Sequence, residues 1–255
     1  MSVADFSLQG KVAIVTGGSR GIGRSISIGL AEAGADVAIA ARKPEALEEA
    51  VQAVSQTGRR AIAIPTNVRR SEELANLVSE TQRQLGRVDI LVNNAGTNPV
   101  FGPVQEIDER AWDMIMNTNV KSIHVLSNLA REAMLQHGDG GSIVNVSSVG
   151  GRAASDVIGG YSVSKAAVIM LTQVQAKTWG TDGIRVNCVA PGLIRTEFSR
   201  ALWENEAILK GATSDAALHR IAEPDEMAGA VVYLASPAAS FVTGQTLVLD
   251  GGRLL

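Results

Sequence analysis

The sequence contains one cysteine, few aromatic residues and no hydrophobic run long enough to cross a membrane. A single cysteine excludes an internal disulfide and favours a reducing compartment. Cys188 lies in the apolar run 184–190, where we expect an inert core thiol. A membrane helix needs about 18 consecutive apolar residues, and no run approaches that length. The first seven residues, MSVADFS, have neither the basic nor the apolar region of a signal peptide. We therefore expect a soluble, cytoplasmic protein.

An excess of either charge is also lacking, because the formal net charge at pH 7 is only −3. Without a polybasic patch, nucleic acid is disfavoured as the main partner. The three histidines, His124, His137 and His219, are scattered without the spacing of metal ligands. We expect neither a metal site nor a catalytic histidine.

Short apolar runs alternate with helical patterns along the whole chain, whose 255 residues are 45% hydrophobic. This length suits one large α/β domain over residues 1–255, with a core of Ala, Val, Ile and Leu. The short runs show no clear polar alternation, as expected for strands covered on both faces. The alternation predicts a parallel sheet with helices on both sides. The candidate strands are residues 11–16, 36–40, 61–65, 89–93, 142–147, 184–190 and 246–249.

Several helix starts can be recognised between these strands. Pro44 suits the first turn before a helix over 45–54, and Ser71 followed by two glutamates opens a helix over 72–85. Pro224 with two acidic residues opens a third, over 225–234. Two longer patterns predict helices over 111–136 and 161–179, which are apolar on more than one face.

Glycine and polar residues follow four of the predicted strands. They are Thr16-Gly17, Asn93-Asn94-Ala95-Gly96, Ser147-Ser148 and Ala190-Pro191-Gly192. In open parallel sheets, ligands bind beyond the carboxyl ends of the strands, near the point where strand order reverses. We therefore expect these residues to share one edge of the sheet and to form a binding site there.

A glycine-rich loop follows the first predicted strand and precedes a helix that runs to about residue 34. Its sequence is Thr16-Gly17-Gly18-Ser19-Arg20-Gly21-Ile22-Gly23. Glycines let the backbone approach a pyrophosphate, while the helix N-terminus offers free N–H groups and a positive dipole end. A lone loop of this kind could be a structural turn. Its place in a βαβ unit favours a dinucleotide site.

Tyr161 and Lys165 are separated by three residues, and Ser148 precedes the tyrosine by thirteen. Positions i and i+4 share a helix face, so both polar groups can point to the same place. A free tyrosine has a pKa of about 10, and a nearby ammonium group favours its ionised form. The pair alone is weak, because most such pairs are solvated surface residues. Together with Ser148 it suggests a proton-transfer site.

Taken together, these motifs resemble the short-chain dehydrogenase/reductase family. The resemblance is carried by TGxxxGxG at 16–23, Asn93-Asn94-Ala95-Gly96, Ser148, the Tyr161/Lys165 pair and Pro191-Gly192, with a similar closing segment at 243–252. It spans nearly the whole chain. It implies a single Rossmann-type three-layer α/β/α domain with a seven-stranded parallel sheet. It also implies an oxidoreductase that interconverts a ketone or aldehyde and an alcohol by hydride transfer.

The resemblance also implies four catalytic roles. Tyr161 would be the general acid and base, and Lys165 would lower the tyrosine pKa and bind the nicotinamide ribose. Ser148 would hold the substrate oxygen, although a strand-end cap is its simpler interpretation. Asn119 matches the fourth family residue, which interrupts a helix and holds a water in a proton relay; Asn117 is the nearby rival.

The cofactor prediction depends on the residue after the second strand. Enzymes that prefer NAD usually place Asp or Glu there, but this chain has Ala41 followed by Arg42 and Lys43. Arg42 can pair with a 2′-phosphate and Arg20 adds a second cation, so we predict NADP(H), with NAD(H) as the alternative. Asn67-Val68 replaces the family's Asp-Val at the adenine, where the Asn oxygen can still accept a hydrogen bond. The implied cofactor-binding residues are Gly17, Ser19, Arg20, Gly21, Ile22, Gly23, Arg42, Asn67, Val68, Asn94, Ala95, Gly96, Tyr161, Lys165, Pro191, Gly192, Ile194 and Thr196.

The family's substrate loops correspond here to residues 97–103, 151–158 and about 193–215. The last segment has an amphipathic pattern that suits either a lid over an apolar ligand or a helix packed on a neighbouring subunit. Few charges lie in these loops, which favours a small apolar ketone, aldehyde or alcohol over a phosphorylated sugar. By resemblance, the helices over 111–136 and 161–179 would form the dimer faces of a homotetramer.

Three other functions remain open from the sequence. A 3-oxoacyl-thioester reductase would need basic residues for its carrier protein, and the predicted lid holds only Arg195 and Arg200. An NAD-dependent alcohol dehydrogenase would keep the same catalytic residues. A non-catalytic dinucleotide sensor is disfavoured, because such proteins typically lose the tyrosine or the lysine.

Overall fold

The computed structural model describes residues 4–255, and seven of their strands form one parallel sheet. The strand order is β3-β2-β1-β4-β5-β6-β7, and every neighbouring pair is parallel. From the central β1–β4 pair, the chain adds β2 and β3 on one side and β5, β6 and β7 on the other. The strands are β1 (Val12–Thr16), β2 (Asp36–Ala41), β3 (Ala61–Pro65), β4 (Ile90–Asn93), β5 (Gly141–Val146), β6 (Ile184–Pro191) and β7 (Thr246–Leu249). All seven predicted strands and the Rossmann-type fold are confirmed.

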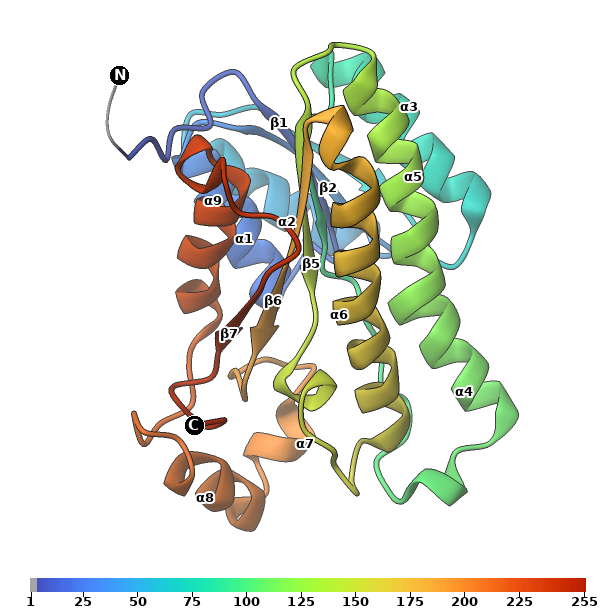
Figure 1. Cartoon of the computed structure of the whole chain (residues 1–255), viewed down its shortest axis with the longest axis vertical. Coiled ribbons are helices and arrows are strands. Elements are labelled where there is room, and N and C mark those ends of the chain that lie inside the picture. The colour runs from blue at the N-terminus through green and yellow to red at the C-terminus, as the bar shows by residue number, and fades with distance from the viewer. Residues whose placement is uncertain (1–3) are drawn as a thin grey trace.

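Helices cover both faces of this sheet (Figure 1). On one face, α1 (Gly21–Glu32), α2 (Pro44–Ser55) and α9 (Ala228–Ala235) bury Leu30, Leu47 and Leu234 against the strands. On the other face, α3 (Ser71–Leu85), α5 (Ser122–Leu135) and α6 (Gly159–Trp179) bury Leu77, Leu126 and Ala176. The strands are apolar on both sides because each side faces a helical layer.

Smaller elements complete the described part of the chain. The helix α4 (Glu109–Met116) precedes α5, and α7 (Arg200–Trp203) and α8 (Glu206–Ser214) follow β6 and lie together beyond the sheet at the bottom of Figure 1. A π-helical turn, η2 (Asn117–Lys121), joins α4 to α5. Short 3₁₀ turns are η1 (Val104–Glu106), η3 (Val149–Gly151), η4 (Gly180–Asp182), η5 (Pro224–Met227) and η6 (Pro237–Ala239).

The helix boundaries differ from the sequence prediction in several places; α2 and α6, for example, begin at Pro44 and Gly159 instead of at residues 45 and 161. The helix expected over 111–136 is divided by η2 into α4 and α5, so the expected interruption is present. The helix expected over 225–234 begins as the 3₁₀ turn η5 and continues as α9. The helix expected over 72–85 begins one residue earlier, at Ser71, with Arg70 as its N-cap residue.

The register of the sheet brings the carboxyl ends of the strands to one level. Thr16 pairs with Ala40, Asn93 with Asn145, and Pro191 with Leu249. Strand order reverses between β1 and β4, so the loops that follow these two strands border the crevice in which ligands of such sheets bind. The polar strand ends found in the sequence therefore meet at one edge, as predicted.

No helix within residues 4–255 has the length and apolarity of a membrane span. Nor do the described residues contain a cluster of three or more His, Cys, Asp or Glu side chains that could hold a metal ion.

Candidate active site

The glycine-rich loop turns sharply between β1 and α1. Gly17 and Gly21 have φ angles of +63° and +53°, in the left-handed region that glycine adopts without steric cost. A Cβ atom on Gly23 would lie 2.3 Å from Gly17 O, so a larger residue cannot fit there. The helix α1 begins at Gly21, and no side chain caps its first turn. Its first N–H groups are therefore not occupied by a side-chain cap, as a phosphate site requires.

Two residues from the neighbouring strand region hold this loop in place. The side-chain amide of Asn94 donates to Thr16 O at 2.9 Å and to Gly17 O at 3.2 Å. In return, the hydroxyl of Thr16 accepts from the backbone N–H groups of Asn94 and Ala95, at 3.0 and 3.1 Å. The side chain of Asn94 thus holds the backbone of the glycine loop, and Asn94 lies just beyond the end of β4, as the sequence predicted.

Two arginines follow the adjacent strands β1 and β2. Arg20 and Arg42 are exposed, and within residues 4–255 neither forms an ion pair. β2 extends to Ala41, one residue further than predicted, so Arg42 directly follows the strand. Ser19 and Ile22 are half-buried in the intervening loop. An anionic group at this crevice would therefore meet two uncommitted cations.

The predicted adenine residues lie after β3. The Asn67 side-chain oxygen accepts from Arg69 N at 3.2 Å, and Asn67 N donates to the Glu73 carboxylate at 2.6 Å. Val68 packs against the core cluster on the α3 side of the sheet. An amide oxygen has two lone pairs, so Asn67 keeps one for a further donor.

Ser148 and Tyr161 face each other across the end of β5. Ser148 is the N-cap residue of η3, and its hydroxyl accepts from Gly150 N at 3.1 Å. Burial raises the pKa of the Tyr161 phenol to about 12, and a hydrogen bond with Ser148 partly offsets this effect. The phenol therefore stays protonated at neutral pH. The strand-end cap and the contact with Tyr161 are both present, so the two interpretations of Ser148 are compatible.

Lys165 lies one turn further along α6 and is buried. Its ammonium group donates to Val146 O at 2.7 Å, and Nζ lies 5.4 Å from the centroid of the Tyr161 ring. Burial lowers the pKa of Lys165 to about 8, against a smaller opposing effect of Cys188. Burial is the larger influence on the Tyr161 pKa in this structure, and the lowering of that pKa by Lys165 stays a prediction.

Asn119 lies at the centre of the π-helical turn η2 and is fully buried. Its side chain accepts from Thr97 N at 2.8 Å and donates to Thr97 O and to the Ser164 hydroxyl, both at 3.0 Å. A Cβ atom on Gly96 would lie 3.6 Å from both Asn119 Oδ1 and Lys165 Nζ, so these two groups border the same space. The rival Asn117 instead borders a surface cleft with Arg69 and Arg110.

The segment after β6 returns to the glycine loop. Gly192 N donates to Leu249 O at 2.9 Å, and buried Ile194 pairs with Ala222 in an isolated bridge. The Thr196 methyl group lies 3.3 Å from the position of a Cβ atom on Gly21. Thr196 is thus adjacent to the loop that the sequence assigned to the cofactor.

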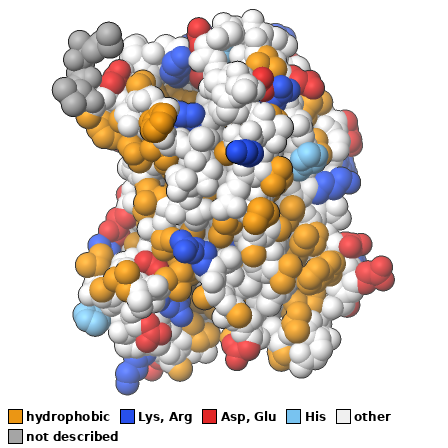
Figure 2. Space-filling view, in the orientation of Figure 1, with side chains coloured by type: hydrophobic (Ala, Val, Ile, Leu, Met, Phe, Trp, Pro, Cys, Tyr) orange, Lys and Arg blue, Asp and Glu red, His pale blue; other side chains and the backbone are white. Residues whose placement is uncertain are grey.

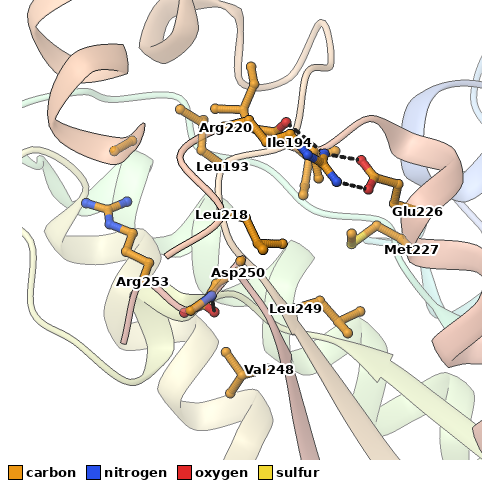
Figure 3. A pocket seen from close by; sticks show the side chains of 15 residues that line it. Leu193, Ile194, Leu218, Arg220, Glu226, Met227, Val248, Leu249, Asp250 and Arg253 are labelled. Atoms are coloured by element: carbon orange, nitrogen blue, oxygen red, sulfur yellow. Dashed lines mark hydrogen bonds and ion pairs between the residues drawn. The ribbon is translucent and has the colours of Figure 1, made fainter. Parts of the chain in front are cut away.

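A cavity of about 240 Å³ lies behind this segment (Figure 3). It is bordered by Leu193, Leu218 and Leu249, with the Arg220–Glu226 ion pair, 2.6 Å between Nη2 and Oε1, on one side. None of the four catalytic candidates borders it. Within the predicted lid segment, Leu193, Ile194 and Ala212 border this cavity, whereas Phe198 adjoins Tyr161.

Three residues of the site make contacts that the sequence did not predict. Thr16 holds the Asn94 backbone, Ser164 connects Asn119 to the Tyr161 carbonyl at 2.7 Å, and Ser147 donates to Lys165 O at 2.7 Å. Ser147 stands directly before Ser148 at a strand end, and this position is the only available signal. Thr16 likewise stands at a strand end, whereas Ser164 is recognised only from its contacts with Asn119 and Tyr161.

Comparisons with known proteins agree with this geometry. A family model described as Enoyl-(Acyl carrier protein) reductase matches residues 17–253. Dehydrogenase/reductase SDR family member 4 of Bos taurus is 39% identical over 247 residues, which cover 97% of this chain and 88% of the relative. The chain belongs to the short-chain dehydrogenase/reductase family. It is therefore an oxidoreductase of that family, and the resemblance found in the sequence is confirmed.

Solved structures of this short-chain dehydrogenase/reductase fold match nearly the whole chain. A gluconate 5-dehydrogenase from Burkholderia cenocepacia J2315, in complex with NADP and tartrate, is 33% identical with a TM-score of 0.93, covering 98% of both chains. A 7α-hydroxysteroid dehydrogenase, complexed with NADH and 7-oxo glycochenodeoxycholic acid, is 33% identical with a TM-score of 0.94, covering 99% of this chain and 97% of the other. Both neighbours hold a nicotinamide dinucleotide, one phosphorylated and one not.

The crevice of this short-chain dehydrogenase/reductase suits such a dinucleotide. The first turn of α1 lacks a side-chain cap, the glycine loop leaves its backbone open, and Arg20 and Arg42 are unpaired among the described residues. Each feature provides a donor or a positive charge for phosphate groups. The residues present therefore fit the cofactor that the family implies.

Proposed function

We propose that this protein is an NADP(H)-dependent oxidoreductase that interconverts a ketone or aldehyde and the corresponding alcohol. The observation that carries the proposal is the arrangement of Ser148, Tyr161 and Lys165 beside the glycine loop. The tyrosine contacts the serine, and the lysine adjoins both Tyr161 and the space bordered by Gly96 and Asn119. A proton donor, an oxygen-binding hydroxyl and a buried cation thus adjoin a dinucleotide crevice.

Each of these residues has a definite part in the proposal. A bound nicotinamide dinucleotide supplies or accepts the hydride at the substrate carbon. Tyr161 donates a proton to the carbonyl oxygen during reduction and accepts it during oxidation, while Ser148 hydrogen-bonds the same oxygen. Lys165 binds the ribose of the cofactor and keeps a positive charge near the phenol. Asn119 holds the Thr97 backbone and η2 in position for the proton relay.

Replacing Tyr161 with Phe tests the catalytic assignment. We expect ketone reduction to fall by about 10² to 10⁴, the usual contribution of a general acid, while cofactor affinity stays within about twofold. Turnover is followed by nicotinamide absorbance with a panel of ketones and alcohols, and affinity by fluorescence titration. Retained turnover in Tyr161→Phe would refute the role of the phenol.

The preference for NADP(H) is proposed from the two cations that flank the crevice. Arg42 directly follows β2, no carboxylate stands at Ala41 to repel a 2′-phosphate, and Arg20 lies in the adjacent loop. NAD(H) is the alternative. We expect NADPH to bind more tightly than NADH. Arg42→Ala should reduce the ratio of the two affinities by about tenfold, as loss of one charge-assisted hydrogen bond predicts.

The control for this titration is Lys177→Ala, which removes an exposed cation from α6 outside the crevice. It should leave both affinities unchanged. Equal binding of NADPH and NADH by the wild-type protein would contradict the phosphate argument without affecting the catalytic assignment.

For the substrate, we propose a small carbonyl compound or alcohol with apolar substituents. Both lid arginines are engaged within their own region: Arg195 pairs with Glu223 at 2.9 Å, and Arg200 pairs with Glu204 at 2.7 Å. Neither is left for a phosphate or an acidic carrier protein. The description of the matching family model keeps a 3-oxoacyl-thioester reductase as the second candidate, and higher kcat/KM on a carrier-bound 3-oxoacyl substrate would favour it.

We also propose that the protein is a single catalytic domain that assembles as a homotetramer in a reducing, cytoplasmic environment. The assembly is supported by exposed apolar side chains along α6, namely Val163, Met170 and Val174. The compartment is supported by the buried state of Cys188, the only cysteine, whose pKa burial raises to about 11.

A further inference from the structure

Phe198 places an aromatic ring beside Tyr161. The two ring centroids are 6.0 Å apart and the ring planes are inclined at 44°, an arrangement typical of a tilted aromatic pair. Phe198 comes from the segment between β6 and α7 and remains 48% exposed. About half of its side chain is therefore free to contact another group next to the proton donor.

The backbone on both sides of Phe198 is firmly held. The buried Ser199 hydroxyl donates to Ile194 O and lies 2.9 Å from the Thr196 hydroxyl. The Trp203 indole donates to Thr196 O at 2.8 Å, and Arg195 lies over the Trp203 ring at 5.3 Å. The backbone that carries Phe198 is thus held by a hydrogen-bonded turn.

Further apolar side chains border the start of α6, which carries Tyr161. Gly102 N donates to Val157 O at 2.8 Å, joining the loop after β4 to the segment before α6. This contact brings Val104 to 3.3 Å from the position of a Cβ atom on Gly159. Phe101, adjacent to Gly102, is also exposed. The two lid arginines, by contrast, are engaged in ion pairs, Arg195 with Glu223 and Arg200 with Glu197 and Glu204.

We propose that Phe198 is a specificity-determining residue that selects substrates with a flat apolar group, in particular an aryl ring, attached to the carbonyl carbon. The proposal rests on the proposed function. With the carbonyl oxygen at Tyr161 and Ser148, a substituent on the carbonyl carbon must lie within a few ångströms of the tyrosine ring. The uncovered part of Phe198 borders that position and would pack against a planar group.

The test compares kcat/KM for acetophenone and for 2-butanone in the wild-type protein, Phe198→Ala and Phe198→Leu. An aromatic contact corresponds to about a 2- to 10-fold effect, and the apolar area lost on truncation adds to it. We expect the ratio of acetophenone to 2-butanone activity to fall about tenfold in Phe198→Ala, and less in Phe198→Leu, which keeps an apolar side chain.

Phe6→Ala is a matched control. Phe6 pairs with Tyr233 at 6.2 Å and 45°, and its side chain is also 48% exposed, but the pair lies by α9 near the N-terminus, away from the lid. The substrate ratio should be unchanged in this variant. An unchanged ratio of the two kcat/KM values in Phe198→Ala would overturn the proposal. If both values fell equally, Phe198 would only support Tyr161; if neither fell, it would not contact the substrate.

A binding measurement separates this proposal from the proposed function. Ligand-detected NMR can compare 1-phenylethanol with 2-butanol on the wild-type protein and on Phe198→Ala. Preferential binding of the aryl alcohol that is lost in the variant supports the selectivity role even if the wild-type protein reduces neither ketone. Equal binding of both alcohols to the wild-type protein overturns it, whatever the turnover.

Discussion

The buried ammonium group of Lys165 connects function to stability at the level of a single residue. It donates one hydrogen bond to Val146 O, and burial lowers its pKa to about 8. An ordinary lysine has a pKa of about 10.4, so the folded protein holds this charge at a free-energy cost. Such a cost is expected where a charge is kept for binding or catalysis.

We expect Lys165→Met to be inactive but more stable than the wild-type protein near pH 7. Because one pKa unit corresponds to about 1.4 kcal/mol, the gain in free energy of unfolding is at most about 3 kcal/mol. The folded-state pKa lies below the unfolded value, so between pH 8 and about 10.4 the unfolded wild-type chain binds more protons, and wild-type stability rises. The difference in free energy of unfolding between the variant and the wild-type protein should therefore be largest below pH 8 and should disappear by about pH 10.4.

Denaturant unfolding of both proteins across this pH range measures the difference. Tyr161, whose pKa burial raises to about 12, titrates in both proteins and largely cancels in the comparison. Lys177→Met, at an exposed position of the same helix, is the control and should show a difference that does not vary with pH. If the difference in free energy of unfolding between Lys165→Met and the wild-type protein also did not vary with pH, the ammonium group would not be desolvated.

The sequence predicts where the candidate site residues lie along the chain, but it does not predict how deeply the fold buries them. The motifs locate Asn119, Ser148, Tyr161 and Lys165, because spacing along a helix or at a strand end fixes where a residue lies. Spacing carries no information on desolvation, which depends on atoms from the whole fold. Both neighbours of the phenol were named from the sequence, but the burial that raises its pKa could not be predicted.

At the level of elements, the sequence predicted strands better than helix ends. An apolar run such as 12–15 is expected to be buried, and its place in an alternating chain determines its layer. The helix over 111–136 has continuous apolar periodicity, and Asn119 was the only sign that η2 would divide it. The hydrogen bonds of Asn119 to Thr97 explain the π turn, but they join residues 22 positions apart and leave no local signal.

The lid shows the same limit. Its amphipathic pattern left open a cover for the substrate or a contact with another subunit, and both interpretations treated residues 193–215 as one unit. In the structure, Phe198 adjoins Tyr161, while Leu193, Ile194 and Ala212 of the same segment border the cavity in Figure 3. The backbone next to Phe198 is held by the turn at Ser199, whose hydrogen bonds fall within five residues of chain. An isolated serine does not distinguish such a turn from an ordinary loop.

At the level of the whole molecule, the helical face that carries α6 remains apolar on its outer side. Figure 2 shows hydrophobic side chains gathered over this part of the surface. Val163, Met170 and Val174 are each about half exposed, and their spacing places them along one stripe of α6. The inner side of the same helix is buried against the sheet. A stripe of this kind on a long helix is typical of an interface between copies of a chain.

We expect Met170→Glu combined with Val174→Glu to break the proposed tetramer into smaller species. Two carboxylates facing their symmetry copies would be buried next to like charges, which an interface cannot accommodate. Light scattering coupled to gel filtration gives the molar mass, and the wild-type protein should run as four 26.6 kDa chains. Gln52→Glu with Ser55→Glu adds the same charges to exposed positions of α2, on the opposite face of the sheet, and should leave the mass unchanged. A monomeric wild-type protein, or an α6 variant with unaltered mass, would show that this stripe does not join subunits.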